Sequence, residues 1–180
     1  SSVVVYGAGA VGLAAVMAAR LTGATRIVAV DRHAGRLALA RELGATHTVD
    51  VTGAEPVDAV RDICGGSADF ALECTGVVEV LRQAADSVAM RGTCAMIGGA
   101  PAGASFTLDH QSTLWGKRVV GILGGEGRSA VLIGSLLELW RQGRFPFDRL
   151  VTEFALDRVE DAIAASASGD VVKPVLRMPA

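Results

Sequence analysis

The sequence predicts an α/β fold in which a parallel sheet of six strands carries helices on both faces. Short, continuously apolar runs alternate with segments of helical periodicity, a pattern typical of strands that are buried on both faces. Hydrophobic residues make up 51% of the chain and aromatic residues only 4%, which favours layers of small aliphatic side chains over an aromatic-cored β-sandwich. Right-handed crossovers between such strands predict the doubly wound order 3-2-1-4-5-6.

The first three strands and their helices occupy residues 1–66. The apolar run SVVVYG predicts a buried strand, and the Gly- and Ala-rich segment after it predicts a helix that ends near Gly23. RIVAVD predicts the second strand, followed by an amphipathic helix closed by Gly44, and THTVD predicts a short third strand. The next helix is expected to begin at Pro56, because proline is tolerated in the first turn, and to stop at the Gly-Gly pair that follows.

Three further strands are predicted at residues 68–76, 92–99 and 117–125, with a helix over residues 77–92 after the first of them. Between the fifth and sixth strands, a Gly- and Pro-containing loop leads to SFTLD, which predicts a short strand, and HQSTLWG, which predicts a short helix. The alternation of strands and helices therefore extends over most of the chain.

The pattern changes beyond Arg128. The segment SAVLIGSLLELWRQG predicts a long amphipathic helix, and the remainder reads as strand, helix and strand, which is too short for a domain of its own. We expect a boundary near residues 143–146, with one domain over residues 1–143 and a C-terminal segment over residues 144–180.

Charge and cysteine content exclude several classes of protein. The formal net charge is −2, so no basic surface indicates a nucleic-acid partner or an acidic membrane. No apolar run reaches the length of a membrane span, and no signal-peptide pattern precedes the first strand. Cys64, Cys74 and Cys94 are widely spaced, so we interpret them as small buried side chains. The chain, which begins with Ser1, is expected to be an excised or processed piece of a cytoplasmic protein.

Gly7, Gly9 and Gly12 form a Gly-x-Gly-x-x-Gly motif where the first strand turns into the first helix. In this context the first glycine permits the tight turn, the second lets a pyrophosphate approach the backbone, and the third lets the helix pack closely on the strand. The helix N-terminus adds free N–H groups and a partial positive charge. The motif alone leaves an alternative open, because glycine-rich turns also occur in strand–helix units that bind nothing.

Asp31 ends the second strand, nineteen residues after Gly12. An acidic residue at this place accepts hydrogen bonds from the adenosine ribose hydroxyls of a dinucleotide. The alternative is that Asp31 only caps the helix that begins near Arg32. A carboxylate repels the 2′-phosphate of NADP, so the sequence favours NAD, although Arg32 or Arg36 could pair with that phosphate.

Small residues also end the later strands, in the motifs ECTG and MIGG. Ligands of doubly wound sheets bind at the carboxyl ends of the strands, where the strand order reverses. Small residues there would let the nicotinamide half of a cofactor lie along the backbone; ordinary turn glycines are the alternative. The candidates are Thr75, Gly76, Gly98 and Gly99, and Leu123 ends the sixth strand in a similar way.

Two long segments carry a resemblance to a known family, GAGAVGLAAVMAARLTGATRIVAVDRHAGRLALARELGATH and GRFPFDRLVTEFALDRVEDAIAASASGDVVKPVLRM. The first resembles the zinc-dependent medium-chain alcohol dehydrogenases, and the second is similar to the end of their aryl-alcohol (benzyl-alcohol) dehydrogenase branch. ECTG, GTCAMIGGAP and GKRVVGILGGEG lie between them in the expected order. The resemblance implies a Rossmann nucleotide-binding domain and a C-terminal return to a catalytic domain, in an enzyme that transfers a hydride between an aryl or primary alcohol and NAD.

The resemblance also implies roles for single residues. Asp31 and Arg36 would meet the adenosine ribose, and Lys173 in KPVLR would contact the pyrophosphate, unless it is a solvated surface lysine. Residues implied at the pyrophosphate are Gly7, Gly9, Ala10, Val11 and Gly12, and those implied at the nicotinamide end are Thr75, Ile97, Gly99 and Leu123.

This chain differs from the family pattern in its zinc ligands. Its ligands lie in an N-terminal region that this chain lacks, and His33, His47 and His110 are too scattered to form a three-ligand site. Because nothing else would lower the pKa of the alcohol, we expect the chain alone to bind NAD without oxidising an alcohol. A standalone NAD-sensing regulatory module is the alternative, although such a module would not need the tail.

One edge of the sheet is a candidate partner surface. The short strand predicted in ASFTLDH and the sixth strand are expected to lie there, and an unpaired edge invites pairing with another chain. The resembling family dimerises through this edge, so we expect a homodimer through residues 104–108.

Overall fold

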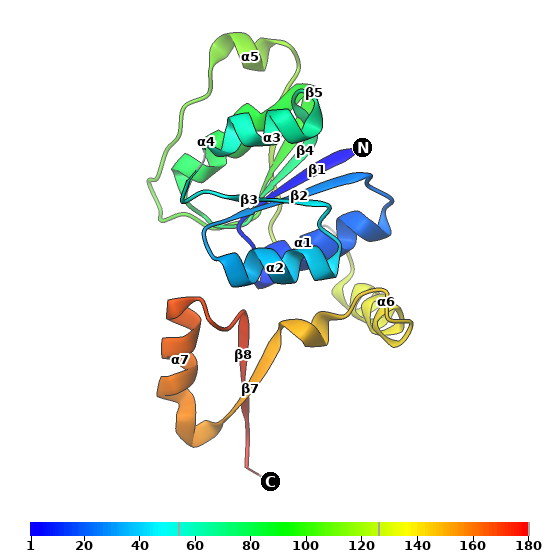
Figure 1. Ribbon diagram of the computed structural model, residues 1–180, viewed down its shortest axis with the longest axis vertical. Helices are drawn as coiled ribbons and strands as arrows, with labels where there is room; N and C mark the ends of the chain where they lie inside the picture. The colour runs from blue at the N-terminus through cyan, green and yellow to red at the C-terminus, as the bar shows by residue number, and fades with distance from the viewer. Residues whose placement is uncertain (54, 126, 180) are drawn as a thin grey trace.

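A doubly wound parallel sheet forms the centre of the molecule (Figure 1). The computed structural model describes residues 1–53, 55–125 and 127–179. Its six strands stand in the order β3-β2-β1-β4-β5-β6, and every ladder between them is parallel. The predicted strand order is confirmed. The strands are β1 Ser2–Tyr6, β2 Arg26–Asp31, β3 His47–Asp50, β4 Ala68–Glu73, β5 Val88–Met96 and β6 Arg118–Gly121.

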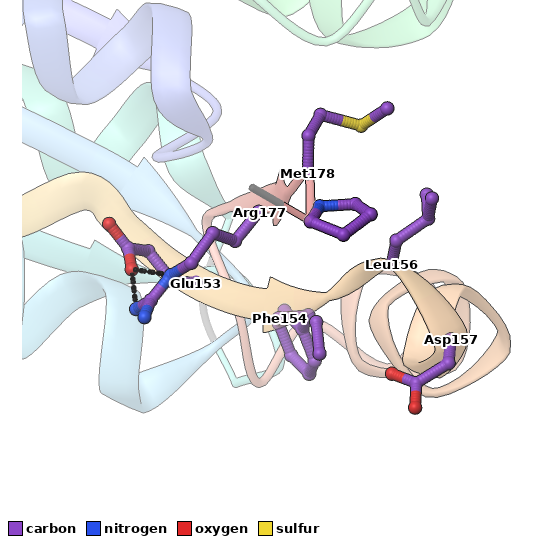
Figure 2. Close-up of a pocket in the computed structure, with 8 residues that line it drawn as sticks. Glu153, Phe154, Leu156, Asp157, Arg177 and Met178 are labelled. Carbon is purple, nitrogen blue, oxygen red and sulfur yellow. Dashed lines mark hydrogen bonds and ion pairs between the residues drawn. The ribbon is translucent and has the colours of Figure 1, made fainter.

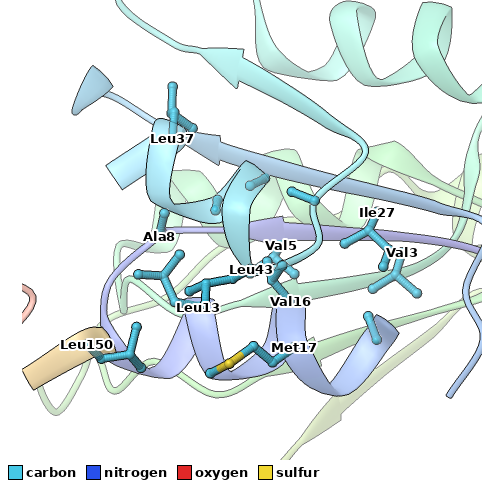
Figure 3. Packing of buried hydrophobic residues seen from close by; sticks show 14 of the residues in the cluster. Val3, Val5, Ala8, Leu13, Val16, Met17, Ile27, Leu37, Leu43 and Leu150 are labelled. Atoms are coloured by element: carbon cyan, nitrogen blue, oxygen red, sulfur yellow. The ribbon is translucent and has the colours of Figure 1, made fainter. Parts of the chain in front are cut away.

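Helices cover both faces of the sheet because successive side chains of β1 point to opposite sides. Val3 and Val5 pack in one apolar cluster with α1 and α2, whereas Val4 and Tyr6 pack in a second cluster with α3 and α4. Figure 3 shows the first cluster, with Leu13 and Val16 of α1 close to β1. The helices are α1 Ala10–Leu21, α2 Ala34–Leu43, α3 Pro56–Cys64 and α4 Val78–Ser87.

The helix predicted over residues 77–92 is shorter than expected, because β5 takes over its last residues. α4 ends at Ser87, whose hydroxyl donates to the Ala84 carbonyl at 2.9 Å, and Val88 is buried and pairs with Ala68 of β4. Register between β4 and β5 shifts just after this pair. Strand pairing has thus overridden the helical periodicity of these residues.

No strand forms at SFTLD, which corrects the short strand predicted there. Within the described part of the chain, β6 pairs only with β5, so SFTLD does not extend the sheet. It is held instead by Phe106 and Leu108, which pack against the second apolar cluster. A short helix, α5 His110–Leu114, follows, with the Asp109 carboxylate accepting the Ser112 N–H at 2.6 Å.

The C-terminal part contains the predicted strand, helix and strand together with two short 3₁₀ turns. β7 and β8 pair as a separate parallel sheet of two strands. Phe145 and Leu150 are buried in the first apolar cluster, so the segment after α6 is packed on the main domain (Figure 3). The boundary near residues 143–146 stays a prediction. The elements are α6 Ser129–Arg141, η1 Phe147–Leu150, β7 Val151–Ala155, η2 Leu156–Arg158, α7 Val159–Ser168 and β8 Lys173–Arg177.

Among the helices of residues 1–53, 55–125 and 127–179, none is both long enough and apolar enough to cross a membrane.

Candidate dinucleotide-binding cleft

A cavity of about 730 Å³ lies at the carboxyl ends of β1, β2 and β4. Side chains from the starts of α3 and α4 complete its wall, among them Pro56, Val77 and Val80. It stands where the strand order reverses, which is the place at which doubly wound sheets take ligands. Six of the predicted residues line it: Gly7, Gly9, Asp31, Arg32, Arg36 and Thr75.

Two glycines of the loop are packed so closely that a side chain at either would collide with neighbouring atoms. Gly7 has a φ of +92°, and a Cβ added to it would lie 2.6 Å from Cγ2 of Thr75. A Cβ on Gly12 would lie 1.7 Å from the Gly7 carbonyl oxygen, so α1 packs directly on the loop. Gly9 differs, because a Cβ there meets no atom within 4 Å. The loop is therefore tightly packed on one side and open on the other.

The N-terminus of α1 presents unpaired donors at this loop. Gly9 is the N-cap and has no side chain to accept a bond; its carbonyl accepts the Leu13 N–H at 2.8 Å. Within the described residues, the N–H groups of Ala10, Val11 and Gly12 find no protein acceptor, and the first turn holds no acidic side chain. These donors and the positive end of the helix dipole make a ready site for an anion.

Asp31 is anchored to the glycine loop. Its side chain is 8% exposed, and its Oδ2 accepts the Ala8 N–H at 2.6 Å. Its Oδ1 accepts the His33 N–H at 2.9 Å and lies 2.8 Å from Nδ1 of the His33 ring. Burial opposes the charge, but these hydrogen bonds prevail and hold the pKa of Asp31 below its ordinary value. α2 begins at Ala34 with His33 as N-cap, so the alternative that Asp31 caps this helix is wrong.

The C-terminal segment reaches the same end of the cleft. Nε of Arg36 donates to the Gly169 carbonyl at 3.3 Å, which joins α2 to the end of α7. A Cβ on Gly169 would lie 2.7 Å from the His33 ring, so the two are in contact. Arg32, by contrast, is exposed and lines the cavity. This contact between the tail and the cleft has no counterpart in any local sequence pattern, because it joins residues that are distant along the chain.

The ends of β4 and β5 meet at the other end of the cleft. A Cβ on Gly76 would lie 2.3 Å from the Gly99 carbonyl oxygen, and a Cβ on Gly98 would lie 2.1 Å from the Gly76 nitrogen. The Ile97 N–H donates to the Glu73 carbonyl at 2.9 Å. The structure thus brings together Thr75, Gly76, Gly98 and Gly99, named from the strand ends, and Ile97, implied by the resemblance; their contact with a cofactor stays a prediction. Sequence reasoning missed Glu73, which is 1% exposed and bonds both loops.

Nine of the fifteen predicted residues do not line the cavity, and two of these, Leu123 and Lys173, also lie apart from the glycine loop and from the loops after β4 and β5. Leu123 follows β6 and is 98% exposed. Lys173 begins β8, is exposed, and pairs with Val151 in the small sheet. Their assignment to a cofactor stays a prediction.

A second hollow of similar volume, about 730 Å³, lies in the C-terminal segment along β7 and β8 (Figure 2). It is bordered by apolar side chains such as Phe154, Leu156 and Met178 and by the ion pair of Glu153 with Arg177. None of the predicted site residues contributes to it. We therefore place the candidate site at the strand ends.

The described residues do not offer a metal centre. Across residues 1–53, 55–125 and 127–179, no three His, Cys, Asp or Glu side chains gather as ligands. Burial, helped by Glu73, raises the pKa of the Cys74 thiol to about 12 and that of Cys94 to about 11. Burial therefore disfavours the thiolate form of both side chains.

Comparisons with known proteins agree with one another. Residues 10–139 match the family model described as zinc-binding dehydrogenase. A geraniol dehydrogenase of Castellaniella defragrans is 37% identical over 97% of this chain and 48% of its own length. The benzyl alcohol dehydrogenase of Acinetobacter calcoaceticus has the same fold with a TM-score of 0.96 and 40% identity, over 99% of this chain and 50% of that one.

A third protein adds a cofactor. A putative zinc-binding dehydrogenase of Sinorhizobium meliloti, bound to NADP, has a TM-score of 0.88 and 30% identity over 98% of this chain and 52% of that one. In all three comparisons, this chain spans about half the length of the other protein.

Proposed function

Because the chain belongs to the zinc-binding dehydrogenase family, we propose that it is the nicotinamide-cofactor-binding part of an alcohol dehydrogenase. The observation that carries the proposal is the joint arrangement of the glycine loop, the open α1 N-terminus and Asp31, whose carboxylate accepts the Ala8 N–H at 2.6 Å. Two of the proteins named above are a geraniol dehydrogenase and a benzyl alcohol dehydrogenase, which supports the same reaction class.

The residues present fit a dinucleotide. The N–H groups of Ala10 and Val11 would bind the pyrophosphate, with Gly9 leaving room for it. Asp31 would accept hydrogen bonds from the adenosine ribose, and the contacting loops after β4 and β5 would bound the nicotinamide end. When bound, the cofactor supplies the hydride acceptor or donor, and the protein orients it and excludes water.

NAD is the proposed cofactor in preference to NADP. Asp31 is buried and has a lowered pKa, so a negative charge faces the ribose where NADP carries its 2′-phosphate. Arg36, the cation that could offset this charge, is bonded to the Gly169 carbonyl. The NADP-bound relative represents the competing choice, and Arg32 is the side chain here that could support it.

A direct binding experiment tests this proposal. We expect NADH to bind more tightly than NADPH to the purified protein, and Asp31→Ala to reduce that preference by lowering NADH affinity about tenfold, since a hydrogen bond to a charged group contributes roughly 1.5–3 kcal/mol. Fluorescence titration measures both constants. Val51→Ala, in the same cavity but without a polar group, is the matched control. Tighter NADPH binding, or an unchanged NADH affinity in Asp31→Ala, would contradict the proposal.

The zinc site and the substrate are proposed for the whole protein and not for this chain alone. The described residues do not fit a zinc site, so we assign none to them and derive no step through the metal. We propose an aryl or other primary alcohol as substrate, supported by the benzyl alcohol and geraniol dehydrogenases among the similar proteins.

A homodimer formed through the β6 edge is also proposed. β6 is the last strand of the sheet and is largely exposed, so its outer edge can pair with a second copy. The segment over residues 104–108, which forms no ladder within the chain, would join that interface.

A further inference from the structure

Glu73 is a buried acidic residue whose polar atoms are all directed to neighbouring loops. It ends β4 and is 1% exposed. Its Oε1 accepts hydrogen bonds from the Thr75 N–H at 2.5 Å, the Thr75 hydroxyl at 2.5 Å and the Gly76 N–H at 3.0 Å. Among the described residues it forms no ion pair, so these donors are what compensate its burial.

The main chain of Glu73 binds the second loop. Its carbonyl oxygen accepts the Ile97 N–H at 2.9 Å and the Gly98 N–H at 3.0 Å. The side chain therefore holds the loop after β4, and the main chain holds the loop after β5. One residue ties together both loops at this end of the cleft.

These loops are in contact with each other and with the glycine loop. A Cβ on Gly98 would lie 2.1 Å from the Gly76 nitrogen, and a Cβ on Gly7 would lie 2.6 Å from Cγ2 of Thr75. The Thr75 hydroxyl, which donates to Glu73, also accepts the Val77 N–H at 3.0 Å, at the start of α4. The Thr75 hydroxyl thus also holds the start of α4, which borders the cavity.

We propose that Glu73 is a positioning residue that sets the nicotinamide end of the cleft. It acts through Thr75 and Gly76 and does not line the cavity. The inference rests on the proposed function, because it assumes that the loops after β4 and β5 bound the nicotinamide. The affinity for NADH should therefore depend on Glu73. The affinity for ADP-ribose, which lacks the nicotinamide, should depend on the glycine loop and Asp31 instead.

The test compares NADH and ADP-ribose binding by calorimetry. Glu73→Leu leaves the Thr75 and Gly76 donors without the carboxylate that accepts their bonds. We expect NADH affinity to fall roughly tenfold and ADP-ribose affinity to stay within about twofold of wild type. Glu73→Gln retains one acceptor oxygen and should restore NADH binding to within about threefold of wild type. Asp69→Ala is the matched control, because its carboxylate is bonded to Ser2 at the opposite end of β4.

The outcomes separate the inference from the proposed function. If Glu73→Leu lowers the affinities for NADH and ADP-ribose equally, the positioning role is overturned. It is also overturned if Asp69→Ala lowers NADH affinity as selectively as Glu73→Leu does. If Glu73→Leu does not fold, Thr75→Val removes the two hydrogen bonds that the Thr75 hydroxyl makes, to Glu73 and to the Val77 N–H, at an exposed site. It should still weaken NADH binding more than ADP-ribose binding, and an unchanged ratio of the two affinities would overturn the inference. Wild-type protein that binds neither ligand would instead overturn the proposed function.

Discussion

The glycines around the cleft differ in what a side chain would meet. Gly12 faces the Gly7 carbonyl, and Gly98 faces the Gly76 backbone, so both are required by contact between main chains. Gly9 has an ordinary extended backbone, with φ −77° and ψ −170°, and open space beside it. The first group serves the fold, and Gly9 leaves room for a ligand.

This difference predicts that alanine at Gly12 lowers stability, whereas alanine at Gly9 lowers ligand affinity. Gly12→Ala should lower the free energy of unfolding by about 1–3 kcal/mol, because the new methyl group forces α1 away from the loop. Gly9→Ala should change it by less than about 1 kcal/mol, yet lower NADH affinity about tenfold by occupying the approach to the N–H groups. Urea denaturation and fluorescence titration measure the two quantities. Equal stabilities of the two variants would contradict the steric explanation.

Single residues were predictable from the sequence where a motif fixes the spacing. The glycine loop and Asp31 stand where the motif placed them. Glu73 was not predicted, because a glutamate at a strand end reads as a surface residue, and its burial depends on loops that are distant in the sequence. The contact of His33 with Gly169 was not predictable either, because it depends on how the tail packs against the main domain.

Helices and strands were predictable where local pattern and tertiary pairing agree. α3 begins at Pro56 as expected, and α7 lies between the two predicted strands of the tail. Residues 88–91 have helical periodicity, yet they begin β5, where Val88 pairs with Ala68 of β4. SFTLD has the composition of a strand but pairs with no strand among the described residues. Both errors arise because hydrogen bonding between strands depends on a neighbour that local sequence does not reveal.

The contact between α7 and α2 can be tested at the level of these elements. Gly169→Ala and Gly143→Ala both place alanine at a positive φ, +89° and +69°, which costs roughly 1–2 kcal/mol in each. Only the first also meets a neighbour, the His33 ring at 2.7 Å. We expect Gly169→Ala to lower the free energy of unfolding by about 1 kcal/mol more than Gly143→Ala, as measured in urea. An equal loss would show that the contact contributes nothing.

At the scale of the molecule, the strand order was predictable and the docking of the tail was not. Alternating strands and helices leave few right-handed arrangements, and the observed order is one of them. The burial of Phe145 and Leu150 against α1 depends on the shape of a surface formed by several elements (Figure 3). Apolar periodicity indicates that such residues are buried but not what they are buried against.

The proposed dimer can be tested at the β6 edge. Gly121→Lys adds a charged side chain at an exposed position where a Cβ meets only Met96, at an ordinary 3.8 Å. Charge on an edge strand opposes pairing with another chain, so we expect a dimeric wild type and a monomeric variant by light scattering. His47→Lys, on the opposite edge strand β3, should remain dimeric. A monomeric wild type at high micromolar concentration would contradict the proposal.

The backbone contacts among the loops also limit how such a protein can evolve. A side chain at Gly7, Gly12, Gly76 or Gly98 would collide with Thr75 or with the main chain of a neighbouring loop, so variation at any of them disturbs these loops before it can alter ligand preference. Gly9 and Gly99 face open space and can accept side chains without that disturbance. Selection for a new cofactor or substrate in this scaffold would therefore act through Gly9 and Gly99. A directed-evolution library should vary these two positions and leave the four tightly packed glycines unchanged.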